Sequence, residues 1–262
     1  MKLAFGSDWH LDHLEDEQLI AFLKTVEDYD ADAVIVSGDI SEGKTLENDL
    51  ISINNILTKP FYFVHGNHDF YYRSYYDIRE QSKLTVEYLQ RINWLELKSI
   101  QLKNKVALCG CDGWYDGGYG DYNKSPFKLY DFSLIDELKF RNQQERLKAM
   151  EAFADVGAAH IRRVLPELLA ENDLVIFVTH VPPFREVCKY KGVPTDVFAL
   201  PFFSSKIIGT ALLDVARRFP KKEILVLCGH THDEASFKFE NINCVCASAR
   251  YGSPSIYTTI EI

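Results

Sequence analysis

The sequence predicts a layered α/β protein, and three observations support this fold class. Apolar runs of strand length recur along the chain, segments with helical periodicity lie between many of them, and two of the runs are joined too closely to enclose a helix. Strands that alternate with helices are typical of sheets covered by helices, whereas a short connection indicates an antiparallel hairpin. We therefore expect a mixed sheet or two sheets.

The expected elements follow one another along the whole chain. The strand-like runs are, in order, KLAFGS, DAVIVSG, FYFVHG, KVALCGC, LVIFVTH, EILVLCG, NCVCASA and SIYTTIEI. Helical periodicity covers residues 17–29, 77–92, 140–169 and 204–219. The hairpin lies in WLELKSIQLKNKVALCGC and turns near Lys103 and Asn104. We expect residues 1–262 to form a single domain, because single α/β domains of this size are common.

Composition narrows the classes of function. A chain with 47% hydrophobic residues can bury a sizeable core. Its 29 Lys and Arg against 38 Asp and Glu give a net charge of -9, which repels phosphate backbones unless a positive charge is held locally. Broad nucleic-acid binding is therefore disfavoured. The N-terminal apolar stretch is too short for a signal peptide and no run reaches the length of a membrane span, so we expect a soluble, cytoplasmic protein.

The six cysteines are interpreted as small buried hydrophobic residues. Cys109 and Cys111 are two residues apart in an apolar run, as are Cys244 and Cys246, so each pair is expected on one face of its strand. The chain contains no CxxC pair, which disfavours a structural zinc site or disulfides and favours a reducing compartment.

Five of the apolar runs end in side chains that can bind metals. These ends are Asp8-Trp9-His10, Gly38-Asp39, Gly66-Asn67-His68-Asp69, His180, and Gly229-His230-Thr231-His232. Because the carboxyl ends of parallel strands share one edge of a sheet, we expect these side chains to meet in one cleft.

The residue types at these ends fit a pair of divalent cations. Neutral imidazole nitrogen, carboxylate oxygen and amide oxygen suit Mn, Fe, Zn or Ni, and the absence of a thiolate from the set disfavours a Cys-rich zinc site. Asp8 and His10 are two residues apart, as are His230 and His232. In an extended backbone each pair projects to one side, where it could bind one metal or straddle two.

In this order the motifs resemble those of the calcineurin-like metallophosphoesterases. The pattern of that family is DxH, GD, GNH followed by Asp or Glu, a later His, and GHxH; this chain has DWH, GD, GNHD, TH at 179–180, and GHTH. The motifs extend from residue 8 to residue 232, nearly the whole chain. The resemblance implies a four-layer α/β/β/α sandwich with two mixed sheets, and a metal-dependent phosphoric ester hydrolase.

The resemblance also implies a role for each candidate site residue. One metal would be held by Asp8, His10, Asp39 and His232, and the other by Asp39, Asn67, His180 and His230. Asp39 would then bridge the two ions, and His68 would be the catalytic imidazole near the leaving group. Manganese is the metal that we most expect to support activity.

Two such cations have a well-defined chemistry. Ions about 3.5–4 Å apart lower the pKa of a bridging water towards about 7 and clamp a phosphate for in-line attack. The implied function is hydrolysis of phosphomonoester or phosphodiester bonds of a small organic or nucleotide substrate by a metal-bridging hydroxide. The bound ions would also make the site locally cationic, so a protein of negative net charge could attract a phosphate ester.

Two branches of the superfamily fit less well. The protein Ser/Thr phosphatases carry an Arg in the segment before GNH, where this chain has Phe63 and Val64. They also have a longer GD motif, and Glu42 stands where that branch has a second Asp. Glu42 either orients His68 or is an exposed loop residue. The lipid A precursor hydrolases typically show GNR in place of GNH.

Two other functions stand as alternatives. A nuclease of the double-strand-break repair type shares GNHD, but the acidic balance and the lack of a basic tract count against nucleic acid as a partner. A noncatalytic metal-binding scaffold of this fold would have lost catalytic residues, whereas His68 and all seven ligand candidates are present. A small phosphate ester is therefore the expected substrate, with no membrane partner.

Residues 112–132 carry many aromatic residues and glycines without a clear period. We interpret this segment as a lid-like loop inserted between core elements, since long loops in compact domains are often functional. One hypothesis is that four of its aromatic residues overhang the metals and form one wall of the substrate pocket: Trp114, Tyr115, Tyr119 and Tyr122. The alternative is a surface loop whose aromatic side chains pack on the sandwich.

Overall fold

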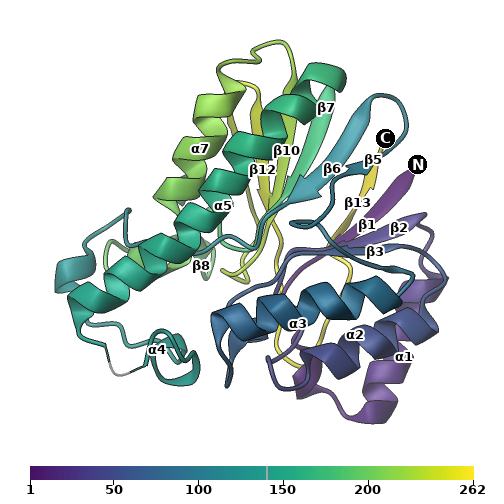
Figure 1. The fold of residues 1–262 in the computed structure, drawn as a ribbon, viewed down its shortest axis with the longest axis horizontal. Helices are drawn as coiled ribbons and strands as arrows, with labels where there is room; N and C mark the ends of the chain where they lie inside the picture. Colours follow the sequence, from purple (N-terminus) through teal and green to yellow (C-terminus); the bar gives the residue numbers. More distant parts are fainter. Residues whose placement is uncertain (140) are drawn as a thin grey trace.

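Two large β-sheets lie face to face in the structure, a computed structural model that describes residues 1–139 and 141–262 (Figure 1). In the first sheet, β1 to β4 are parallel and follow one another in sequence order, and β13 lies antiparallel beside β1. The strands are β1 (Lys2–Gly6), β2 (Ala33–Val36), β3 (Phe61–Phe63), β4 (Ile92–Trp94) and β13 (Thr258–Glu261).

The second sheet has the order β11-β12-β10-β7-β6-β5, with a parallel centre and an antiparallel strand at each edge. Its strands are β5 (Ile100–Gln101), β6 (Val106–Gly110), β7 (Leu174–Val178), β10 (Glu223–Cys228), β11 (Ala235–Phe239) and β12 (Ile242–Cys246). β5 and β6 form the hairpin that the sequence predicts. A separate small hairpin consists of β8 (Lys189–Tyr190) and β9 (Val193–Pro194).

Helices cover the outer face of each sheet. α1 (Asp16–Asp28), α2 (Leu46–Ile56) and α3 (Tyr75–Tyr88) pack on the first sheet. α5 (Gln143–Glu171) and α7 (Lys206–Ala216) pack on the second, and run side by side in Figure 1. The layers are therefore α/β/β/α, as the family resemblance implied. None of the helices in the described part of the chain is long and apolar enough to cross a membrane.

Short helical segments connect these layers near the strand ends. They are α4 (Asp131–Leu134), α6 (Leu200–Phe203) and the 3₁₀ turns Leu11–His13, His68–Phe70, Tyr122–Lys124 and Arg185–Val187.

The central strands are apolar on both faces because both faces are buried. In β1, Leu3 and Phe5 point into the core between the sheets, whereas Ala4 points towards the helices. In β7, Val178 lies between the sheets and Phe177 packs under α5 and α7. This double burial explains the near-continuous apolar runs in the sequence.

Four helices lie where the periodicity predicts them, with ends shifted by a few residues: α1, α3, α5 and α7. The predicted start of the third at Phe140 falls outside the described residues. α2 was not predicted, because its sequence LENDLISINNI mixes Asn, Asp and Ser with apolar residues and so has a weak helix propensity.

The loop at residues 112–132 is tied into the core. Trp114, Tyr115 and Tyr122 are buried in the cluster that also holds the helices of the first sheet, and Tyr119 is half-buried. The Tyr115 hydroxyl donates a hydrogen bond to Asp131 at 2.7 Å. The ring of Tyr115 does lie at the site, since it stacks on that of His230 with centroids 6.0 Å apart, but all three rings are buried, so the hypothesis of an exposed wall is wrong for them.

All six cysteines are free and buried. The predicted pairs, Cys109 with Cys111 and Cys244 with Cys246, each lie on the helix-covered face of the second sheet. They pack there as small hydrophobic side chains, as predicted.

Candidate metal centre

The strand ends singled out by the sequence lie at one side of the two sheets. In the first sheet, Gly6 pairs with Val36 and Val36 with Phe63, so β1, β2 and β3 end at the same level. In the second sheet, Leu227 of β10 pairs with Val178 of β7. The segments that follow these strands carry all eight predicted site residues: Asp8, His10, Asp39, Asn67, His68, His180, His230 and His232.

Hydrogen bonds join these segments across the two sheets. The backbone N–H of Asp8 donates to Gly38 O at 3.0 Å. The N–H of His230 donates to both carboxylate oxygens of Asp8, at 3.0 and 3.1 Å. The site therefore lies between the two sheets, where Asp8 from the first sheet is hydrogen-bonded to His230 from the second.

Five of the predicted ligands have a left-handed backbone. Their φ angles are 52° for Asp8, 44° for His10, 50° for Asp39, 70° for His230 and 59° for His232. This conformation costs roughly 1–2 kcal/mol per non-glycine residue, and such residues cluster at functional sites. The paired ligands therefore converge through tight turns and not through the extended backbone expected from their spacing.

One group of converging ligand atoms contains Asp8, His10 and His232. Nε2 of His232 lies 3.2 Å from Asp8 Oδ1 and 3.3 Å from Nε2 of His10. Two imidazole nitrogens that face each other need a proton or a metal cation between them. Nδ1 of His10 is buried without a hydrogen-bond partner among the described residues, so no hydrogen bond at this nitrogen ties the ring to one tautomer.

In the second group of ligand atoms, two backbone carbonyls orient the imidazole rings of His180 and His230. Nδ1 of His180 lies 2.8 Å from Ser37 O, and Nε2 of His230 lies 2.9 Å from Phe202 O. A carbonyl oxygen can only accept a hydrogen bond, so each of these ring nitrogens carries the proton. The opposite nitrogens of His180 and His230, which are 3.2 Å apart, then present lone pairs to the same space when both rings are neutral.

Two oxygen atoms complete this second group. Oδ1 of Asn67 lies 3.1 Å, and Oδ2 of Asp39 3.4 Å, from Nε2 of His180. When His180 is neutral, four hydrogen-bond acceptor atoms therefore converge here, and none of these four atoms is a donor. Imidazole nitrogens, a carboxylate oxygen and an amide oxygen are together ligands that fit a divalent transition metal. Each imidazole is also fixed by a hydrogen bond from its other nitrogen to a backbone carbonyl, as is usual for metal-binding histidines.

Asp39 lies between the two groups. Its Oδ2 is 3.4 Å from Nε2 of His180 in the second group and 3.8 Å from Nε2 of His10 in the first. Its Oδ1 accepts a hydrogen bond from the backbone N–H of His68 at 2.8 Å. One carboxylate therefore faces both sets of ligand atoms.

Burial and charge shift the pKa values in the site. Burial opposes ionisation of Asp8 and Asp39, but the neighbouring histidines, His232 and His180 respectively, outweigh it and lower the pKa of both carboxyls. Burial also disfavours the charged form of His180, yet Asp39 raises the pKa of that imidazole to about 10. Burial lowers the pKa of His230 to about 4. The carboxylates stay ionised, and a proton on His180 occupies the space that a metal would take.

His68 lies at the solvent-accessible side of the cluster. Its ring stacks on Tyr71 with centroids 4.2 Å apart and meets the ring of His10 edge-on at 4.6 Å. It is half-buried, and one of its ring nitrogens lies within 4.8 Å of ligand atoms of His10 and Asp39. Glu42, the possible orienting residue, pairs with Lys44 at 2.7 Å.

The GNHD loop is held against the ligands without spare room. The carboxylate of Asp69 accepts hydrogen bonds from the N–H groups of Gly66 and Ser41, at 2.7 and 2.9 Å. A Cβ atom on Gly66 would lie 2.2 Å from Asp39 Oδ1 and 2.7 Å from Cε1 of His180. Only glycine lets the backbone pass this close to the site.

Sequence reasoning missed a buried support beneath this loop. Oδ1 of Asp112 accepts from the N–H of His65 at 2.9 Å and from Nε1 of Trp94 at 2.7 Å. Arg79 pairs with Asp112 and also with Glu96, whose oxygen is 2.5 Å away. These contacts join β3, β4, β6 and α3 below the site. The sequence offered no motif for them, because they are isolated polar residues inside apolar or helical segments.

Sequence reasoning also missed Tyr251. Its ring centroid lies 4.3 Å from that of His10 and 4.7 Å from that of His232. The signal was weak because the segment from Ala247 to Tyr257 has no period and no metal-binding motif.

A cavity of about 370 Å³ lies beside the second group of ligands. Thr231, between two predicted ligands, lines this cavity, and so does Phe203, whose ring is 5.1 Å from that of His230. Other walls come from Phe127 and from the β8–β9 hairpin.

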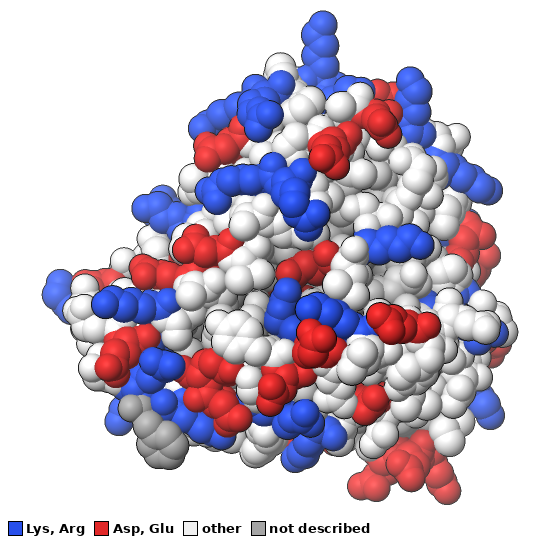
Figure 2. Space-filling model, in the orientation of Figure 1, with Lys and Arg blue, Asp and Glu red and all other residues white. Residues whose placement is uncertain are grey.

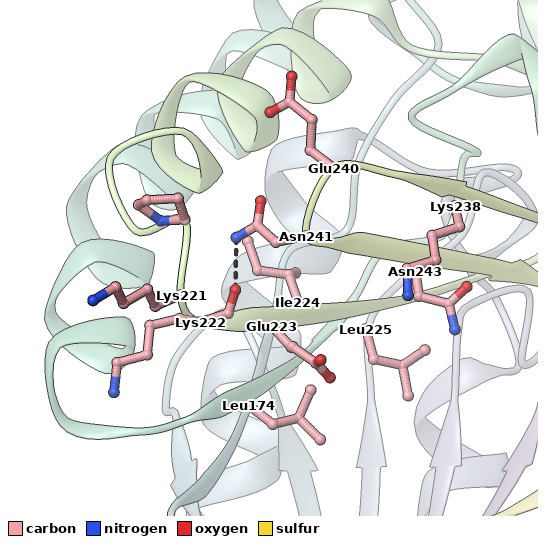
Figure 3. A pocket seen from close by; sticks show the side chains of 11 residues that line it. Leu174, Lys221, Lys222, Glu223, Ile224, Leu225, Lys238, Glu240, Asn241 and Asn243 are labelled. Carbon is pink, nitrogen blue, oxygen red and sulfur yellow. Dashed lines mark hydrogen bonds between the residues drawn. The ribbon is translucent and has the colours of Figure 1, made fainter.

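Figure 3 shows a different hollow, of about 350 Å³, at the opposite ends of β7 and β10. Lysines and asparagines surround it, and Asn241 donates a hydrogen bond to the carbonyl of Lys222 at 2.6 Å. None of the predicted site residues lines it.

Comparisons with known proteins agree with this architecture. A family model described as calcineurin-like phosphoesterase matches residues 1–234. A search of curated protein sequences found no match. Among solved structures, phosphopantetheinyl hydrolase from Mycobacterium tuberculosis is similar with a TM-score of 0.69 and 14% identity over 95% of this chain and 89% of that one. A dimetal phosphatase from Danio rerio gives a TM-score of 0.59 and 14% identity over 97% and 89% of the two chains. At this identity the structural likeness shows the fold alone.

Proposed function

The chain belongs to the calcineurin-like phosphoesterases, metal-dependent hydrolases of phosphoric esters, and from this membership we propose that it cleaves phosphomonoester or phosphodiester bonds of a small organic or nucleotide substrate. The observation that carries the proposal is a set of three groups of converging ligand atoms, of which the last two share Asp39: Asp8-His10-His232, His10-Asp39-His68 and Asp39-His180-His230. Such clusters hold divalent cations, with Mn, Fe, Zn and Ni as the candidates and Mn²⁺ as the ion proposed to support activity.

We propose the following ligand sets. Asp8, His10, Asp39 and His232 hold one ion, and Asp39, Asn67, His180 and His230 hold the other. When bound, two such ions supply Lewis acidity and a water of lowered pKa near the phosphate. Binding must displace the proton on His180, so metal affinity rises with pH.

The chain's own residues then divide the remaining work. His68 lies beside the cluster and is placed to give a proton or a hydrogen bond to the ester oxygen that leaves. Ser37 O and Phe202 O keep the two imidazoles of the second group turned towards the substrate side. The hydrogen bonds of Asp69 keep Asn67 and His68 in place.

A small substrate is supported by the surroundings of the site. The cavity beside Thr231 has a volume of about 370 Å³, the size of a small-molecule pocket. On the face shown in Figure 2, Lys and Arg side chains alternate with Asp and Glu, which does not favour a long nucleic acid as substrate. The six free cysteines support a reducing compartment, such as the cytoplasm.

Reconstitution with metal tests the proposal. The purified protein is stripped with a chelator, reloaded with Mn²⁺, analysed for bound metal, and screened against nucleotides, cyclic nucleotides, phosphodiesters and sugar phosphates. We expect two ions per chain and Mn²⁺-dependent turnover of at least one small ester. Asp39→Asn should lower the content of both ions, and turnover by at least roughly 10- to 100-fold, the loss typical even for an outer-shell partner.

A surface variant provides the control. Among the described residues, the carboxylate of Asp136 pairs with Lys139 alone, at the surface, so Asp136→Asn should retain both ions and full turnover. One ion or none after reloading would overturn the dinuclear site, and two ions without turnover of any ester would overturn the proposed activity.

A further inference from the structure

Tyr251 stands over the metal centre from a segment outside the family match, which ends at residue 234. Its ring centroid is 4.3 Å from that of His10, 4.7 Å from that of His232 and 6.1 Å from that of His68. The centroids of His10 and His232 are only 5.3 Å apart, so both imidazoles lie on the same side of the Tyr251 ring. The ring of His13 also lies beside it, with centroids 5.2 Å apart, and Tyr251 is still 53% exposed.

The segment that carries Tyr251 is fixed to the site at both ends. Before it, the N–H of Ala249 donates to the carbonyl of His232 at 3.2 Å. After it, the carbonyl of Ser255 accepts from Nε1 of Trp9 at 3.1 Å, and Trp9 lies between two predicted ligands. The position of the ring relative to the metal centre is therefore fixed, because the backbone on each side of Tyr251 is hydrogen-bonded to a turn that carries predicted ligands.

The position of the ring relative to His68 indicates what it contacts. His68 is proposed to face the oxygen that leaves, so the alcohol part of the ester must pass beside this imidazole. Tyr251 is the exposed aromatic residue whose ring lies nearest to His68 on the His10 side of the site. A flat exposed ring favours a flat partner, since aromatic pairs are worth roughly 0.5–1.5 kcal/mol beyond the area that they bury.

We propose that Tyr251 is a specificity-determining residue that packs against a planar aromatic group on the alcohol side of the phosphate ester. The inference rests on the proposed phosphoesterase function and narrows its substrates to esters of aromatic alcohols or nucleosides. No covalent step is assigned to Tyr251, which acts by contact alone.

Two matched probes isolate this contact. Benzyl phosphate and cyclohexylmethyl phosphate, or their methyl diesters, have primary alcohol leaving groups of similar basicity and differ mainly in the flatness of the ring. The ratio of kcat/KM for the two is measured for wild type, Tyr251→Phe and Tyr251→Leu, each loaded with Mn²⁺. Any change in metal content acts on both probes and cancels in the ratio. Bound metal is measured as well, together with the Kd of benzyl phosphonate.

The expected result is a ratio that favours the benzyl ester in wild type and in Tyr251→Phe. In Tyr251→Leu the ratio should fall roughly 2- to 12-fold, the fold-change of 0.5–1.5 kcal/mol, mainly through KM. The Kd of benzyl phosphonate should rise by the same factor, and that of inorganic phosphate should stay constant. Tyr130→Leu is the control, because Tyr130 is 78% exposed and its ring makes no aromatic contact with the site histidines among the described residues.

A ratio in Tyr251→Leu equal to that of wild type overturns the proposal, whatever happens to overall activity. A loss that is equal for both probes and follows the metal content would assign Tyr251 to the support of His10 and His232. Absence of metal-dependent turnover in wild type would instead refute the proposed function, so the two failures are distinguishable.

Discussion

At the residue scale, two backbone carbonyls decide what the second ligand group can bind. Ser37 O and Phe202 O each take up one ring N–H, of His180 and His230 respectively. Once His180 has lost its inward proton, the inward nitrogens of both rings are left as acceptors beside Asp39. The tautomers are therefore set by the fold before any ion arrives, which reduces the reorganisation that binding requires.

His68 should matter for turnover more than for metal binding, since none of the proposed ligand sets includes it. A positioned general acid contributes roughly 10²- to 10⁴-fold, so His68→Ala should lower kcat by that factor on an alkyl ester and far less on an activated aryl ester. Metal content should stay at the wild-type level by elemental analysis.

The matched variant for this experiment is His13→Ala. The side chain of His13 is 49% exposed and its ring lies 6.0 Å from that of His10. The His13 ring also lies 5.2 Å from that of Tyr251, so its loss should act on KM, whereas kcat on the alkyl ester should stay at the wild-type level. Near-normal kcat of His68→Ala on the alkyl ester would contradict the role assigned to His68.

Asp49 provides a prediction of stability against pH. It is buried in α2 and accepts a hydrogen bond from Ser41, and burial raises its pKa from 3.8 to about 6. The folded protein therefore holds this proton more tightly than the unfolded chain. The proton on Asp49 therefore stabilises the folded protein fully below about pH 4. This stabilisation is lost as the pH rises to about 6, so the free energy of unfolding falls by up to roughly 3 kcal/mol.

Asp49→Asn removes this titration. Urea denaturation at pH 4 and pH 7.5 should show that the wild type loses more stability over this interval than the variant does. Equal losses in the two proteins would mean that Asp49 has the same pKa when folded and unfolded.

At the scale of elements, the proposed function depends on the backbone conformation of the turns that follow the strands. Each parallel strand in the site ends level with its neighbours, and left-handed turns then direct the side chains inward. The GNHD and GHTH turns both pack tightly against the predicted ligands, because a Cβ at Gly66 would meet Asp39 and His180, and a Cβ at Gly229 would lie 2.3 Å from Asp8 Oδ2.

Gly66→Ala should therefore displace the ligands. The φ of Gly66 is not in the left-handed region, so contact alone causes the effect. We expect loss of bound metal and a destabilisation of roughly 1–3 kcal/mol, as for other overpacked sites, measured by elemental analysis and urea denaturation.

Gly192→Ala separates this effect from general damage. A Cβ at Gly192 would meet nothing within 4 Å, and the substitution carries only the cost of its φ of 78°. It should retain both ions while losing about 1–2 kcal/mol. Full metal content in Gly66→Ala would show that the loop can move away from the ligands without consequence.

Much of the fold and the convergence of the proposed ligands could be predicted from the sequence because both rest on local patterns. Apolar runs mark strands buried on both faces, and motifs such as DWH and GHTH lie where those strands stop. The places of Tyr251 and Asp112 could not be predicted, and the packing of Trp114 was only one of two alternatives, because each depends on contacts between distant segments. Helix α2 was not predicted because its local helix propensity is weak, and its packing on the sheet overrides this propensity.

At the scale of the whole molecule, the proposed ligands join the two halves of the sandwich. Asp8, Asp39 and Asn67 follow strands of the first sheet, whereas His180, His230 and His232 follow strands of the second. An ion held by both groups therefore binds only when the sheets are correctly packed, and it stabilises that arrangement by mass action.

Thermal unfolding should report this linkage. Mn²⁺ at about 100 times its Kd should stabilise the protein by about 2.7 kcal/mol for each of the two proposed ions relative to the chelated form, equivalent to a rise in Tm of roughly 5–10 °C per ion. In Asp39→Asn the rise should be much smaller. A Tm that is the same with and without bound Mn²⁺ would indicate that the ion binds equally well to the unfolded chain.

The antiparallel pairing of β13 with β1 also bears on how the chain folds. β1 to β4 pair in sequence order within the first 94 residues, whereas β13 joins Lys2 to Glu261 across almost the entire chain. Contacts of such wide sequence separation form slowly, because the loop must close before the pairing stabilises it. β13 should thus dock late, as should the similarly distant contact that joins Asp8 to His230 in the site. The ring of Tyr251, carried on the segment that leads into β13, would then reach its place as the centre itself forms.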